Sequence, residues 1–286
     1  MMPQHLIALA LLPLVCVSAQ QRSHGAAVAA LAGSRPNIVF FFADNLGWGD
    51  IAAFGSPSIA TPHVDSIRAD GMRLDHWVSA ASLCSPSRAS LMTGRLPVRT
   101  GVYPGVFHAD ARDGLPLNET TVAEALQSAG YATAAVGKWH LGQRKQYLPI
   151  ARGFDTWTGL PGSADQGSVP GNECGWDING TENLPLFRDD AIIQQPVNLS
   201  GLAAHYADFA ATFIKGAVDD DTPFFLYVPF SHVHQLCYPN RQQWCGPRFA
   251  NASAGGPLGD AVQPVKILQN TFSDRSSFLR SPSAVS

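Results

Sequence analysis

The stretch Asn37-Ile-Val-Phe-Phe-Phe-Ala43 is a continuous apolar run that ends at Asp44 and Asn45. A short apolar run bounded by polar residues and glycine is typical of a strand buried on both faces of a parallel sheet. The sequence therefore predicts a central strand over 37–43, and it places two oxygen-bearing side chains directly after that strand.

The remainder of the chain alternates helical and extended patterns. We expect strands over 72–80, 131–136 and 223–230, and a loop-rich region over 145–200. Helices are expected over 85–93, 121–128 and 202–218, and another begins at Thr61 or Asp65 and ends at Ala69, with Pro62 at the first helical position. This alternation predicts an α/β fold with a mainly parallel sheet.

Three of the predicted strands end in polar clusters. Asp44 and Asn45 follow the first strand, Lys138 and His140 follow strand 131–136, and His232 and His234 follow strand 223–230. Ligands of open α/β sheets bind at the carboxyl ends of the strands. We therefore expect these clusters to form one site.

Composition excludes several classes of protein. The chain has 286 residues, a formal charge of −3 and 45% hydrophobic residues, so disorder throughout is excluded. With 26 Gly and 21 Pro, a coiled coil is excluded as well. A sequence pI of about 6.3 argues against a nucleic-acid partner held by bulk positive charge.

The N-terminal residues indicate export. Leu6 to Val17 is an apolar run too short to cross a bilayer core of about 30 Å, and the small residues Val17-Ser-Ala19 follow, so we expect a signal peptide over 1–19 and a polar leader over 20–35. No later run is long enough for a membrane span. N-glycosylation motifs lie at Asn118, Asn179, Asn198 and Asn251. Together these features predict a glycoprotein of the secretory pathway, lysosomal or extracellular.

The cysteines are few. Cys237 and Cys245 lie in one loop and could form a local disulfide, and Cys174 has no obvious partner. Cys84 lies at the start of a predicted helix, one turn before Arg88, and both features stabilise negative charge on a reactive residue. The alternative from these residues alone is a buried structural cysteine beside a surface arginine.

Two motifs resemble those of a known family. Cys84-Ser-Pro-Ser-Arg88, continued by Leu91-Met-Thr-Gly94, resembles the C-x-P-x-R signature of type I sulfatases, and Gly130 to His140 resembles the second signature of that family. The similarity to arylsulfatase A-like members covers about residues 35–260. It implies an alkaline-phosphatase-like sulfatase sandwich, a mainly parallel central sheet with helices on both faces, with 36–261 forming the N-terminal part of the catalytic domain.

The resemblance implies a hydrolase of sulfate monoesters. Cys84 would be oxidised by the formylglycine-generating enzyme to formylglycine, whose hydrate captures the sulfate group and then releases it by elimination. Asp44, Asn45 and the modified Cys84 would bind Ca²⁺ or Mg²⁺. Most relatives have Asp at the second of these positions, so Asn45 keeps one ligand oxygen and loses a charge.

The resemblance also assigns roles to basic and polar side chains. Arg88 would hold the hydrated aldehyde. Lys138 would bind the sulfate oxygens, and His140 would accept a proton during elimination. His234 would bind substrate and protonate the departing alcohol, and Ser163 would hydrogen-bond in the same site. His232 is either a neighbour of this site or a packed core histidine.

The resemblance ends near Asp260. The residues after Ala261 are unlike the family, and no Asp-Asn-Gly segment follows. We therefore expect a fold incomplete at its C-terminus, with a divergent, disordered tail over 262–286. The main alternative is a truncated, catalytically inactive secreted glycoprotein. A phosphate-ester relative would need Ser or Thr as nucleophile. The sequence does not choose among a sulfated small molecule, glycan or lipid as substrate, and it leaves the oligomeric state open.

Overall fold

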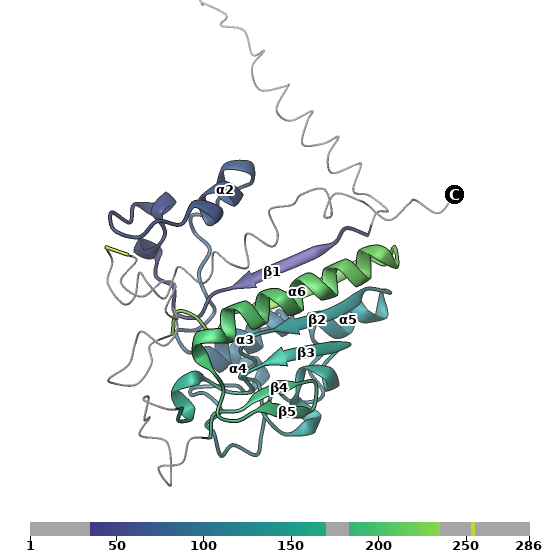
Figure 1. Cartoon of the computed structure of the whole chain (residues 1–286). Coiled ribbons are helices and arrows are strands. Elements are labelled where there is room, and N and C mark those ends of the chain that lie inside the picture. The colour runs from purple at the N-terminus through teal and green to yellow at the C-terminus, as the bar shows by residue number, and fades with distance from the viewer. Residues whose placement is uncertain (1–34, 170–182, 235–252, 255–286) are drawn as a thin grey trace, which may run out of the picture.

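The computed structural model describes residues 35–169, 183–234 and 253–254 (Figure 1). The predicted signal peptide, the tail over 262–286, the Cys237–Cys245 pair and the sequons at Asn179 and Asn251 lie outside the described residues. The domain boundaries therefore stay predictions.

The described residues form a six-stranded sheet with the strand order β1-β6-β2-β3-β4-β5. β1 and β6 pair in parallel, as do β6 and β2, and β2 and β3, whereas β4 and β5 add antiparallel strands at one side. The mainly parallel sheet predicted from the sequence is confirmed. The strands are β1 (Ile38–Phe42), β2 (Ala132–Val136), β3 (Thr156–Gly159), β4 (Leu186–Arg188), β5 (Ala191–Gln194) and β6 (Phe224–Pro229).

Helices cover both faces of the sheet (Figure 1). They are α2 (Pro62–Asp70), α3 (Cys84–Thr93), α4 (Pro97–Thr100), α5 (Val122–Ser128) and α6 (Leu202–Asp219), with several short 3-10 turns between them. α6 lies across one face, and α3 and α5 pack on the other. None of the helices in the described segments is both long and apolar enough to cross a bilayer.

β6 shows why the central strands are apolar throughout. Phe224, Leu226 and Val228 belong to the core beneath α6, while Phe225 and Tyr227 belong to the core beneath α3 and α5. Successive strand residues point to opposite faces, so a strand with a core on each side has no polar face. The side chains of β1 divide between the same two cores.

The predicted strand over 72–80 is wrong. These residues form no strand, and all of them are exposed, with Trp77 69% and Val78 82% accessible. A strand requires a hydrogen-bonding neighbour, and no described strand pairs with this segment. The region predicted to be loop-rich, 145–200, instead contains β3, β4 and β5, each only three or four residues long.

The predicted helices are confirmed, with ends that shift by a few residues. α3 begins at Cys84, holds Pro86 in its first turn, and ends before Gly94, whose φ of +67° is the left-handed conformation that glycine adopts readily. α5 begins after Thr121, whose hydroxyl accepts a hydrogen bond from the backbone of Glu124 while the Glu124 carboxylate accepts one from the backbone of Thr121.

Candidate active site

The polar clusters that follow β1, β2 and β6 meet at one edge of the sheet, as the sequence predicts. The backbone N–H of Asp44 donates to the carbonyl of His232 at 2.9 Å, and that of Val233 donates to the carbonyl of Asp44 at 2.8 Å. The N–H of Lys138 donates to Pro229 at 2.7 Å. Backbone hydrogen bonds therefore hold the three strand ends together before any side chain is considered.

The Asp44 carboxylate lies at the centre of the site. Its Oδ2 is 2.7 Å from Nζ of Lys138, and its Oδ1 is 3.3 Å from Nη2 of Arg88. All three side chains are at least 95% buried. Burial on its own raises the pKa of the Asp44 carboxyl, but Lys138 and then Arg88 outweigh it and lower the pKa to about 2. Asp44 is therefore ionised at any physiological pH.

Cys84 is the first residue of α3 and lies within this cluster. Its Sγ is 3.2 Å from Nζ of Lys138, which also donates to Oγ of Ser163 at 2.9 Å. Burial opposes ionisation of the thiol. A hydrogen bond with His234 and the charge of Lys138 outweigh burial, and they lower the pKa of Cys84. Among the described residues Cys84 is the free cysteine, and it is partly accessible.

Arg88 lies one turn along α3 and is buried. Its Nη1 donates to the backbone carbonyl of Lys138 at 2.7 Å, and its guanidinium lies 5.3 Å from the ring centre of Phe42. Burial opposes its charge, but the Asp44 carboxylate outweighs this and raises the pKa of Arg88. The buried cysteine with a surface arginine, the alternative from the sequence, is therefore wrong.

The histidines of the site differ in environment. Burial, and then the neighbouring Lys138, lower the pKa of His140 well below its usual value. Burial also lowers the pKa of His234, but its hydrogen bond with Cys84 outweighs this, so the pKa of His234 is raised. Its Nε2 lies 4.0 Å from Oδ1 of Asp165. Burial lowers the pKa of His232 to about 4.

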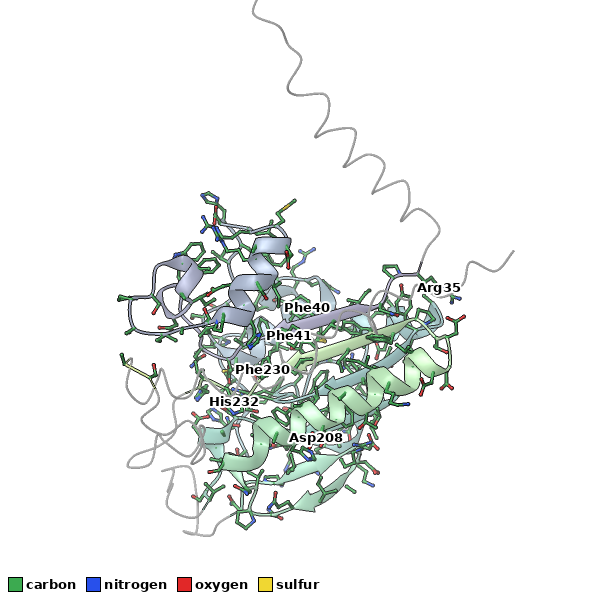
Figure 2. The ribbon with its side chains drawn as sticks, turned by 45° about the horizontal axis from the view of Figure 1, so that its top comes forward. Arg35, Phe40, Phe41, Asp208, Phe230 and His232 are labelled. Carbon is green, nitrogen blue, oxygen red and sulfur yellow. The ribbon has the colours of Figure 1, made fainter. Side chains whose placement is uncertain are left out.

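His232 is packed in the core beside the site. Its ring lies 6.5 Å from those of Tyr206 and Phe230, and Phe230 in turn stacks on Phe41 of β1 with ring centres 6.0 Å apart (Figure 2). Its side chain is fully buried. The packed-histidine interpretation fits this setting, while the backbone carbonyl of His232 still holds Asp44.

A cavity of about 250 Å³ opens beside Cys84, and Asp44 and Asn45 line it. Asn45 is exposed and adopts a φ of +61°, which asparagine tolerates better than most residues. One ligand atom from each of Asp44, Cys84 and His234 lies within 4.8 Å of the others, so these three residues could hold a metal ion. The structure thus brings every predicted catalytic, substrate-binding and metal-binding residue to one place.

The sequence interpretation missed three residues of this site. The backbone of Phe107 accepts from Gln166 and donates to Oγ of Ser85, the residue after Cys84, at 3.0 and 3.1 Å. The carbonyl of Phe107 also contacts Nε2 of His140 at 2.8 Å. Ser163 and Gln166 have the S-x-x-Q spacing of a capping box, the one signal that could have indicated this contact.

Comparison with known proteins gives the family. The sulfatase family model matches residues 36–266. The chain is 44% identical to arylsulfatase A of Homo sapiens over 258 residues, 86% of this chain and 50% of that protein. It is 45% identical to arylsulfatase G of Rattus norvegicus over 222 residues, 70% of this chain and 41% of that protein.

Solved structures share the fold. A sulfatase from Pseudoalteromonas sp. superposes with a TM-score of 0.69 at 28% identity, over 91% of this chain and 56% of that chain. The chain spans about half the length of the curated relatives it matches. The fold is the alkaline-phosphatase-like fold of these enzymes. The chain belongs to the sulfatase family.

Proposed function

We propose that this chain hydrolyses sulfate monoesters at Cys84, after the formylglycine-generating enzyme has converted that residue to formylglycine. The observation that carries the proposal is the position of Lys138, whose Nζ lies 3.2 Å from Sγ of Cys84, 2.9 Å from Oγ of Ser163 and 2.7 Å from Asp44. When formylglycine is present, its hydrate supplies two hydroxyls on one carbon, one to take up the sulfate group and one to expel it.

Lys138 and Ser163 are suited to binding the sulfate group. Both are buried, and Nζ of Lys138 contacts Oγ of Ser163 and Sγ of Cys84. A sulfate monoester carries a negative charge that an ammonium and a hydroxyl can bind through charge-assisted hydrogen bonds. Arg88 adds a second buried cation that holds the negative charge of the site.

The two histidines are suited to opposite proton transfers. His140 contacts the carbonyl of Phe107, which can only accept, so Nε2 of His140 carries the proton and Nδ1 is left as the base. The low pKa of His140 keeps that base free. The raised pKa of His234 favours its protonated form, which can donate to the departing alcohol oxygen.

Asp44 and Asn45 would hold the divalent cation. Their carboxylate and amide oxygens line the same cavity as Cys84, and hard oxygen ligands suit Ca²⁺ or Mg²⁺. The ligand atoms of Asp44 and Asn45 are therefore of the type that these cations prefer. Water or ligands outside the described residues would fill the other coordination positions. The cation would polarise the bound sulfate.

We infer the substrate class from the relatives, and the compartment from the sequons and the predicted signal peptide. One relative, 35% identical, is an N-acetylgalactosamine-6-sulfatase, and others are arylsulfatases. A sulfated small molecule, glycan or lipid is therefore the substrate we propose, with no nucleic-acid partner. The exposed sequons at Asn118 and Asn198 and the predicted signal peptide support the secretory pathway, lysosomal or extracellular.

A second candidate is a catalytically inactive glycoprotein of the same family. It is favoured by the small number of charged ligands. Among the described residues that line the cavity, Asp44 is the one carboxylate and Asn45 the one amide, and both oxygens of Asp44 already face cations. A cation that prefers six or more oxygens would bind such a site weakly.

One experiment separates these candidates. The chain is co-expressed with the formylglycine-generating enzyme, and hydrolysis of an aryl sulfate is measured with and without added Ca²⁺. We expect turnover that Cys84→Ala abolishes, and no comparable turnover of the matching aryl phosphate. Absence of aryl sulfate turnover in protein shown to contain formylglycine would contradict the proposal and support the inactive candidate.

A further inference from the structure

The backbone of one residue, Phe107, connects the loops that carry the catalytic residues. The N–H of Phe107 donates to Oγ of Ser85 at 3.1 Å, and Ser85 follows Cys84 on α3. The carbonyl of Phe107 lies 2.8 Å from Nε2 of His140 and 3.0 Å from Nε2 of Gln166. The conformation of the Phe107 backbone therefore depends on groups from three different parts of the chain.

The amide of Gln166 is fixed at both ends. Its Nε2 donates to the Phe107 carbonyl, and its Oε1 accepts from the N–H of Ser163 at 3.3 Å. A carbonyl can only accept and a backbone N–H can only donate, so a flipped amide would lose both hydrogen bonds. Gln166 thus connects the carbonyl that holds His140 to the backbone of Ser163, whose hydroxyl contacts Lys138.

Among the described residues, the ring of His140 makes no other hydrogen bond through its nitrogens. Only 2% of His140 is accessible, and among the described residues its Nδ1 is a buried atom without a hydrogen-bond partner. Packing holds the buried ring, but its tautomer rests on the contact between Nε2 and the Phe107 carbonyl. A carbonyl that turned away would remove the preference for Nε2–H over Nδ1–H.

We propose that Gln166 is a positioning residue for His140, acting through the Phe107 carbonyl to keep the Nε2–H tautomer and leave Nδ1 free as a base. Gln166 does not touch the reacting atoms. The inference deepens the proposed function and rests on it for its effect on turnover, whereas its effect on the His140 ring requires no turnover.

Gly162 offers an independent way to displace the same amide. A Cβ at Gly162 would lie 2.9 Å from Oε1 of Gln166, closer than real contacts allow, and Oε1 is at the far end of a flexible side chain. Gly162→Ala therefore shifts Gln166 while keeping its chemistry. Gln143 is the matched control, because its Nε2 donates to the carbonyls of His108 and Ala109, the next two residues of the same loop.

The test is nitrogen NMR of the full chain labelled in its histidine rings, with the His140 signals assigned by their loss in His140→Asn. In the unaltered chain at neutral pH we expect Nε2 protonated and Nδ1 unprotonated. Gln166→Leu and Gly162→Ala should both populate the Nδ1–H tautomer, whereas Gln143→Leu should leave the His140 signals unchanged. If Gln166→Leu does not fold, Gly162→Ala decides alone.

Turnover gives a second readout in protein that contains formylglycine. We expect Gln166→Leu to lower kcat about tenfold or more, the size typical of residues that orient a catalytic or ligating histidine. Unchanged His140 signals in both Gln166→Leu and Gly162→Ala would overturn the inference, as would an equal change in Gln143→Leu. A chain that hydrolyses no sulfate ester would refute the proposed function while the NMR result still decides the role of Gln166.

Discussion

Nζ of Lys138 lies 2.7 Å from Oδ2 of Asp44, and both side chains are almost completely buried. Lys138→Met would leave the Asp44 carboxylate in a buried site with Arg88 as its remaining cation. Breaking a buried pair by removing one partner costs about 3 kcal/mol or more. We expect that loss in the free energy of unfolding, measured by chemical denaturation.

The control for this prediction is the double variant Lys138→Met with Asp44→Asn. Because Asp44→Asn also removes the counter-charge of Arg88, the comparison is with Asp44→Asn alone, and Lys138→Met should cost less in that background than in the unaltered chain. A Lys138→Met variant as stable as the unaltered chain would show that Lys138 and Asp44 do not interact as the structure describes.

The buried state of His140 predicts a dependence of stability on pH. Its native pKa lies well below its unfolded value of about 6.5, because burial and then Lys138 disfavour the protonated ring. Below about pH 6.5 the unfolded chain therefore binds more protons than the native chain, so the free energy of unfolding falls as the pH falls. Above that pH this contribution is constant.

His140→Gln removes the proton that the unfolded chain binds at His140 and the native chain does not. The slope of stability against pH below about 6.5 should decrease by up to about 1.4 kcal/mol per pH unit, as measured by denaturation at a series of pH values. His232, with a pKa of about 4, acts in the same direction and remains as an internal reference. An unchanged slope in His140→Gln would contradict the buried, neutral state of His140.

Gly137 lies at the end of β2, where the loop turns into the site with a φ of +134°. A Cβ at this position would collide with the carbonyl of Pro229 on β6, a backbone atom that cannot move aside cheaply. We expect Gly137→Ala to cost about 4 kcal/mol or more in the free energy of unfolding.

The matched control is Gly94→Ala, at the end of α3. Gly94 also has a positive φ, but a Cβ there would meet nothing within 4 Å. Gly94→Ala should cost only about 1 kcal/mol in the free energy of unfolding, because only the backbone conformation disfavours alanine there. Similar losses in the two variants would show that the close approach of Gly137 to β6 is not what requires glycine.

Glycosylation of the exposed sequons is the prediction that addresses compartment. Asn118 and Asn198 are both exposed, so their side chains are accessible to a glycan. In protein secreted from eukaryotic cells, we expect an endoglycosidase to lower the mass, and Asn118→Gln and Asn198→Gln each to remove one glycan. Unglycosylated asparagine at both positions would show that these exposed sequons are not used and would remove their support for a glycoprotein of the secretory pathway.

The central strands and the location of the site could be predicted because both depend on local patterns. Apolar runs such as 37–43 identify strands buried on both faces, and parallel strands necessarily bring their carboxyl ends to one edge. The sequence therefore predicts that Asp44, Lys138 and His234 lie together. The sequence also predicts that Arg88 lies in this site, because one helical turn separates it from Cys84.

The errors arise where structure depends on distant partners. The segment 72–80 has strand-like residues, but a strand forms only with a hydrogen-bonding neighbour, and no described strand pairs with it. β4 and β5 are only three and four residues long, too short for an apolar run or an alternation to be distinguished from a loop. The role of the Phe107 backbone is invisible in the sequence, because a carbonyl contact does not depend on the identity of its side chain.

The most direct test of the central claim is mass spectrometry of the peptide that contains Cys84, in protein recovered from the secretory pathway of its native cells. The account predicts that the side chain has the mass of an aldehyde in place of a thiol. A peptide that retains an unmodified thiol would contradict sulfate ester hydrolysis at this residue and leave only membership of the family.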